Sequence, residues 1–96
     1  GNTVNNATDT ESGRNSSNWK TGIGILVDNA TGFVTVQGNT LNGNTDGIRI
    51  ADTDIAYTES STPITVSGNK VYNSGDKGII IKFTDGAYVE GNTIDN

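Results

Sequence analysis

The chain has 96 residues and a formal net charge of −5, from six basic and eleven acidic side chains. This length allows one small domain or a piece of a larger repeat array, and the acidic balance argues against binding to nucleic acid or to an anionic membrane. The sequence has no Cys and no His, which excludes disulfides, thiolate or imidazole metal sites and His-dependent catalytic triads. Val and Ile supply 17 of the 21 Val, Ile, Leu and Phe residues, and Gly and Asn number 13 each, so short strands with tight turns are favoured over helices.

Three kinds of segment recur along the chain. A hexapeptide of the form G-N-[TK]-[VIL]-x-[NG] occurs at 1–6, 38–43, 68–73 and 91–96. After each of the first three hexapeptides comes a Gly-Ile segment: GIGILVDN (22–29), GIRIADT (47–53) and GIIIKFT (78–84). Before each of the last three comes a third segment: FVTVQ (33–37), ITVS (64–67) and AYVE (87–90). Each turn of the chain therefore predicts three short strands, and the repetition is typical of a solenoid.

The alternation of side chains within these segments predicts which of them face inward. For the first strand the expected inward column is Val4, Leu41, Val71 and Ile94. For the second strand the expected columns are Ile23, Ile48 and Ile79, then Ile25, Ile50 and Ile81. For the third strand they are Val34, Ile64 and Ala87, then Val36, Val66 and Val89. These columns predict an all-β fold, a right-handed parallel β-helix of about three turns with three short strands each, over 1–96 as a single segment.

The Gly-Asn pairs are expected at the corner after the third strand. A sharp bend there favours a residue that adopts positive φ, which glycine does at little cost. The asparagines that follow, Asn39, Asn69 and Asn92, would then stack along the axis, with Asn2 as a further member. Stacked amides can hydrogen-bond the turns above and below and satisfy the backbone groups of the bend.

The G-N-[TK]-[VIL]-x-[NG] and G-I-x-I segments resemble the right-handed parallel β-helix repeats of the pectate-lyase-like superfamily. Similar repeats occur in NosD-like periplasmic proteins, in alginate lyases and epimerases, and in phage tailspikes. The resemblance covers almost the whole chain outside two insertions and implies the fold. It implies no particular activity, because the motif belongs to the scaffold.

Two polar insertions are expected as surface loops, at 7–21 and at 52–63. Both border the second strand, so they are expected to wall a shallow groove over the outer face of its sheet. The outward residues expected on that face are Gly24, Leu26, Arg49, Ala51, Ile80 and Lys82. Aromatic rings beside charged groups suit a sugar ring and its hydroxyl or uronate groups. The residues predicted to bind carbohydrate are Trp19, Arg49, Tyr57 and Lys82; the alternative is that the two aromatic residues pin their loops to the sheet.

An enzymatic role is the competing hypothesis. Residues 44–47 resemble the N-T-D-G stretch of polygalacturonase-type glycosidases, but the Asp-Asp pair, the Gly-His-Gly and the Arg-x-Lys of those enzymes are missing, so Asp46 is expected to be a corner residue. A lyase or C5-epimerase of acidic glycans needs a base and a cation, and Arg49, Lys82 and Tyr57 have suitable chemistry. Asp52 and Asp54 offer oxygen ligands for Ca²⁺, although no cofactor and no metal site is predicted.

The sequence thus favours a non-catalytic module, structural or adhesive, that has a possible polysaccharide ligand. Its acidic composition fits an extracellular or cell-surface location. The first alternative is a fragment of a polysaccharide lyase, epimerase or hydrolase, and the second is a filament subunit that stacks end to end. Three turns are the minimum for a stable solenoid and leave sticky ends. Expected partners are therefore further β-helix turns of the same protein or another copy, with neither nucleic acid nor a membrane.

Overall fold

The computed structural model describes residues 2–5, 22–30, 33–53, 64–84 and 86–95, and none of these residues is helical. Ten strands follow one another: β1 (Thr3–Asn5), β2 (Ile23–Asp28), β3 (Val34–Gln37), β4 (Thr40–Asn42), β5 (Asp46–Thr53), β6 (Ile64–Ser67), β7 (Lys70–Tyr72), β8 (Lys77–Thr84), β9 (Ala87–Glu90) and β10 (Thr93–Asp95). They form three parallel sheets, with the orders β1-β4-β7-β10, β2-β5-β8 and β3-β6-β9.

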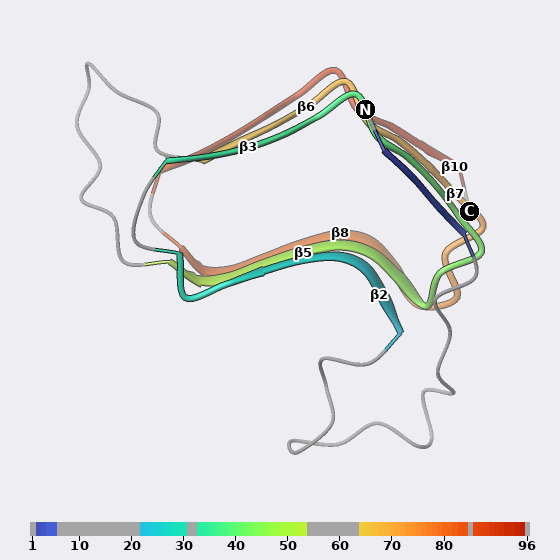
Figure 1. The fold of residues 1–96 in the computed structure, drawn as a ribbon, viewed down its shortest axis with the longest axis horizontal. Helices are drawn as coiled ribbons and strands as arrows, with labels where there is room; N and C mark the ends of the chain where they lie inside the picture. Colours follow the sequence, from blue (N-terminus) through green and yellow to red (C-terminus); the bar gives the residue numbers. More distant parts are fainter. Residues whose placement is uncertain (1, 6–21, 31–32, 54–63, 85, 96) are drawn as a thin grey trace.

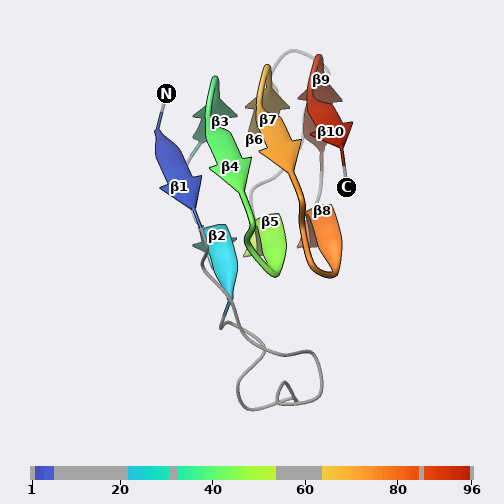
Figure 2. The same cartoon turned by 90° about the vertical axis from the view of Figure 1, so that its right-hand side faces the viewer.

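The three sheets are the sides of one prism around which the chain winds. Viewed along the stack, the strands of each sheet lie over one another (Figure 1), and from the side the successive coils lie next to each other (Figure 2). Every strand pairs with the strand that occupies the same side of the neighbouring coil, always in the parallel sense. The predicted all-β parallel β-helix is confirmed.

The predicted inward columns of the first and third strands are confirmed in their register. In the first sheet Val4, Leu41, Val71 and Ile94 are successive partners. In the third sheet the columns are Val34, Ile64 and Ala87, then Val36, Val66 and Val89. Residues of the central coil are the most completely buried, because a coil covers them on both sides.

The second strand differs from the sequence prediction in its first coil. Ile25 pairs with Ile48 and Val27 with Ile50, whereas Ile23 lies beside Asp46. The expected columns that began at Ile23 and Ile25 are therefore wrong by two residues in that coil, although the Ile48–Ile79 and Ile50–Ile81 pairs are confirmed.

Steric contact between coils explains this shift. The register aligns Gly24 with Gly47 and Gly78. A Cβ at Gly24 would lie 2.6 Å from Leu41 Cδ2 and 2.8 Å from the carbonyl oxygen of Gly47, so this position excludes a side chain. Gly22, which the sequence aligned with Gly47, has a φ of 75° and lies in the turn before β2.

The asparagine ladder is confirmed along the corner between the third and first sheets. The amide Nδ2 groups of Asn2, Asn39 and Asn69 donate to the Oδ1 of the asparagine one coil further on, at 3.2, 2.9 and 2.8 Å. The backbone N–H groups of the same residues donate to the same oxygens. Gly38, Gly68 and Gly91, which precede the ladder residues, all have positive φ, as the corner requires.

The two predicted insertions fall mostly outside the described residues. Residues 7–21 and 54–63 are not among them, and residues 52 and 53, expected at the start of the second loop, continue β5. The insertions therefore remain predictions.

The glycine column gives a first test. A Cβ at Gly47 would lie 2.5 Å from both the Gly78 carbonyl oxygen and Val71 Cγ1, whereas at Gly75 the nearest atom would be 3.6 Å away. We expect Gly47→Ala to lower the free energy of unfolding by about 1–3 kcal/mol, because overpacked sites force backbone shifts. Gly75→Ala, the matched control, should change it by about 0.5 kcal/mol or less. Urea denaturation followed by circular dichroism measures both, and equal effects would contradict the steric explanation.

The ladder gives a second test. Asn69 is fully buried, and its side chain also donates to the Val36 carbonyl oxygen at 3.0 Å. Asn69→Ala leaves buried donors and acceptors of two coils without partners, so we expect a loss of about 2 kcal/mol or more in thermal or urea unfolding. The control is Asn42→Ala on the exposed face, where the hydrogen bond that Asn73 Nδ2 donates to Asn42 Oδ1 is lost. A loss in the control as large as in Asn69→Ala would show that burial of the ladder is unimportant.

Candidate functional site

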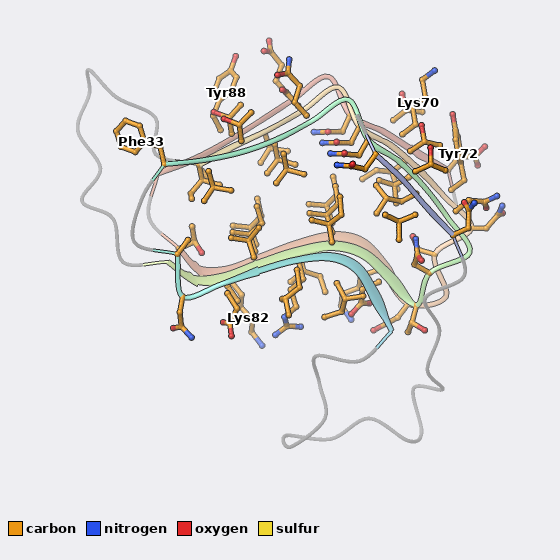
Figure 3. The ribbon with its side chains drawn as sticks, viewed as in Figure 1. Phe33, Lys70, Tyr72, Lys82 and Tyr88 are labelled. Carbon is orange, nitrogen blue, oxygen red and sulfur yellow. The ribbon has the colours of Figure 1, made fainter. Side chains whose placement is uncertain are left out.

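The outer face of the β2-β5-β8 sheet carries the residues that the sequence singles out. Two columns cross it: Leu26, Arg49 and Ile80 form one, and Asp28, Ala51 and Lys82 form the other. Lys82 extends away from the other two sheets (Figure 3). Arg49, Ile80 and Lys82 lie in these columns as expected. Ala51, also expected to face outward, is only 1% exposed, and the register shift in the first coil brings Asp28 into the columns in place of Gly24.

Arg49 and Lys82 lie diagonally on adjacent strands, as expected. Arg49 pairs with Ile80, two residues before Lys82, so their Cα atoms are about 8 Å apart in a regular sheet. Arg49 is partly buried and Lys82 is exposed. Asp28 lies diagonally from Arg49 on the opposite side, so the face carries two cations and a carboxylate at neighbouring positions of a stiff sheet.

The aromatic half of the predicted site is not tested. Trp19 and Tyr57 lie outside the described residues, as does Asp54, and the side chain of Asp52 is likewise not described. The carbohydrate-binding role of Trp19 and Tyr57, the groove between the loops and the calcium option all remain predictions.

The N-T-D-G stretch forms a buried corner. Asp46 is fully buried and its Oδ1 accepts the backbone N–H of Lys77 at 3.2 Å. Asn44 is almost as buried and its Nδ2 donates to the Val4 carbonyl oxygen at 3.1 Å. Both side chains therefore tie one coil to the next, and the fully buried carboxylate of Asp46 is out of reach of a glycosidic bond.

Exposed aromatic residues on the outer face of the third sheet escaped the sequence reasoning. Phe33 is 71% exposed and Tyr88 48%, and both project outward in Figure 3. The Tyr88 hydroxyl donates to Glu90 Oε2 at 2.7 Å, and this hydrogen bond, together with the negative charge of Glu90, raises the pKa of Tyr88. The sequence does contain a signal for Tyr88: it lies between the inward Ala87 and Val89, so the alternation of the strand directs it outward.

Metal binding and membrane insertion are two further possibilities for this chain. The part of the chain that the structure describes contains no group of three or more His, Cys, Asp or Glu residues that could hold a metal ion. Over the same ranges, no helix is long and apolar enough to cross a membrane.

Comparison with known proteins identifies the family. A family model described as "Periplasmic copper-binding protein (NosD)" matches residues 1–96. Neither the curated proteins nor the solved structures gave a match. NosD proteins form right-handed parallel β-helices and are periplasmic, in agreement with the fold, the family resemblance and the extracellular or cell-surface location that the sequence predicts. With its strands, corners and asparagine ladder arranged as that fold requires, the chain belongs to the NosD family.

Proposed function

We propose that this chain is a non-catalytic scaffold module outside the cytoplasm that binds acidic polysaccharide across the outer face of the β2-β5-β8 sheet. The observation that carries the proposal is the diagonal placement of Arg49 and Lys82 on adjacent strands of that face. Carboxylates of a polyuronate attract such a pair, and an arginine can hold a carboxylate in bidentate fashion. Because neighbouring coils already hold these strands in place, the backbone loses little conformational entropy when the ligand binds.

The polar groups inside the fold support a structural role rather than catalysis. Four buried polar side chains make hydrogen bonds between coils, either to the backbone or to each other: Asn39, Asn44, Asp46 and Asn69. Among the described side chains of the proposed binding face, Asp28 is the one carboxylate. The common hydrolytic mechanisms need two, so the described part of the face favours binding over glycoside hydrolysis.

Copper does not fit the donors that these residues supply. Copper(I) prefers thiolate and thioether sulfur, and imidazole is a usual copper ligand. The 96 residues include no Cys, no Met and no His, and the described part has no acidic cluster that could substitute for them. We therefore derive no function of this segment from copper, whatever other members of the family bind.

Polysaccharide binding is tested by affinity electrophoresis in gels that contain polygalacturonate, with a neutral glucan gel as reference. We expect retardation in the polyuronate gel alone, decreasing with salt as exposed charges are screened. Arg49→Ala and Lys82→Ala should each weaken binding by about two- to fivefold. The matched control is Lys70→Ala, because Lys70 is an exposed lysine on β7 in a different sheet.

Two outcomes would contradict the proposal: no retardation of the unmodified chain, or an equal effect of Lys70→Ala. The predicted contact of Trp19 with sugar has its own readout, since the chain contains a single tryptophan. Its fluorescence should change as polygalacturonate is added and should not change with the neutral glucan.

Copper binding is tested by competition. We expect the chain, mixed with copper(I) and a chromogenic copper(I) chelator, to leave the absorbance of the chelator complex unchanged, because soft ligands are missing. A stoichiometric loss of absorbance would show that the amide and carboxylate groups form a copper site after all.

A further inference from the structure

The pair Asn42-Gly43 joins the exposed end of a strand to a glycine corner. Asn42 is the last residue of β4, which lies between β1 and β7 in the first sheet, and its side chain is exposed. Gly43 follows in the bend toward β5 with a φ of 74°. Of the 13 asparagines, Asn42 is the one that a glycine follows in these 96 residues. Because Gly43 has no Cβ, its backbone nitrogen can approach the side-chain carbon Cγ of Asn42 closely.

We propose that Asn42 is a site of spontaneous deamidation, at which the backbone nitrogen of Gly43 displaces the side-chain amide as ammonia and leaves an aspartate or an isoaspartate. The reaction needs only water and hydroxide as co-reactants. The inference concerns the outer face of the first sheet. It goes beyond the polysaccharide binding proposed for the β2-β5-β8 sheet and does not rest on it.

The proposed steps conserve atoms and charge. Hydroxide removes the proton of the Gly43 N–H, and the nitrogen forms a bond to Asn42 Cγ while the electron pair of the Cγ=Oδ1 double bond moves to Oδ1. When this intermediate collapses, the Cγ–Nδ2 bond breaks, and Nδ2 takes a proton from water and leaves as ammonia. Water then opens the cyclic imide. Attack at Cγ gives aspartate, and attack at the main-chain carbonyl carbon gives isoaspartate, whose main chain runs through Cγ.

A hydrogen-bond donor already lies at the atom where negative charge develops. Asn73 occupies the corner position of the next coil that corresponds to Gly43, since Asn42 and Tyr72 are register partners. Its Nδ2 donates to Asn42 Oδ1 at 2.9 Å. When the nitrogen attacks Cγ, Oδ1 becomes an oxyanion, and a donor placed there stabilises the oxyanion more than the neutral amide. The contact with Asn73 therefore favours the reaction.

The backbone of the sheet slows the reaction but leaves it possible. The Gly43 N–H donates to the carbonyl oxygen of Tyr72 at 3.1 Å, just beyond the end of β4, a strand of three residues. Bonds at the ends of elements open at a lower free energy than bonds in the core, so the attack requires a local opening and no global unfolding. The ladder residues Asn39 and Asn69 differ, because they are buried and their Nδ2 groups are held by the next coil.

The two products act differently on the coil. Lys70 and Tyr72 project outward from the first sheet (Figure 3), and Asn42 lies beside Tyr72 and diagonally from Lys70. A carboxylate at position 42 therefore gains a nearby cation, and its oxygen still accepts the hydrogen bond from Asn73. An isoaspartate adds one carbon to the main chain and displaces the Gly43 N–H from its acceptor. The first product keeps the stack and adds a negative charge, whereas the second loosens the corner.

Peptide mapping of the full chain after incubation in a mildly alkaline native buffer tests the proposal. Trypsin places Asn42 and Asn73 in different peptides, and mass spectrometry with fragmentation locates any change against a sample that was not incubated. We expect the mass gain of an amide that becomes a carboxyl group at Asn42, at a rate that rises with pH. The exposed Asn73 should react at least about tenfold more slowly, because the Cβ of Ser74 hinders the attacking nitrogen.

Two substitutions separate the chemistry from the stability of the corner. Gly43→Asn introduces the residue type that already adopts positive φ in the next coil, where Asn73 has a φ of 53°. The fold should persist, and modification of Asn42 should fall by about tenfold or more, because residue 43 then has a Cβ. Asn73→Asp removes the donor at Oδ1 and should lower the rate by about threefold or more, whereas a corner that was merely looser would react faster. Circular dichroism verifies the fold of each variant.

Three results would overturn the proposal. The first is an unchanged Asn42 in native buffer under conditions that modify the urea-unfolded chain, since the fold would then prevent the reaction. The second is an equal rate at Asn73, and the third is an equal rate at Asn42 in the Gly43→Asn variant. A faster reaction in Asn73→Asp would overturn the role assigned to Asn73.

Discussion

The parallel register between coils is the constraint on which the rest of the structure depends. Because side chains alternate along a strand, a slip of one residue would turn every aliphatic column outward. Two features oppose such a slip, one just before and one just after the first-sheet strand of a coil. The glycine column at Gly24, Gly47 and Gly78 leaves no room for a side chain between adjacent strands. The asparagine ladder repeats the same hydrogen bond between side-chain amides from coil to coil at the corner.

This register explains how a small apolar content supports an ordered protein. Each coil covers the next, so Leu41, Ile48 and Val66 are fully buried in a prism only one side chain deep. In the last coil that the structure describes, Val89 and Ile94 are each 49% exposed, whereas Val66 and Val71 of the coil before it are fully buried. The same register places Arg49 and Lys82 diagonally on neighbouring strands of the outer face.

How far the sequence predicts the molecule depends on the local signal at each position. The columns of the first and third strands were predicted because each first-strand segment has a single Gly-Asn pair to align, and each third-strand segment has a single aliphatic-x-Val motif. The second strand failed in its first coil because Gly22 and Gly24 both precede an isoleucine. The diagonal placement of Arg49 and Lys82 was predicted correctly, because β5 and β8 each contain a single Gly-Ile pair from which their alignment can be counted. Phe33 and Tyr88 were missed because the positions that recur from coil to coil are the inward aliphatic ones, whereas the outward positions vary.

The sequence by itself determined the fold class, the corners and most of the inward columns, because these follow from short motifs that recur along the chain. The tertiary structure alone decided which glycine enters the core and that Asp46 is buried. The physical reason is common to both. Each depends on the few ångströms that separate strands of different coils, and such a distance is a property of the stack, which no single segment contains.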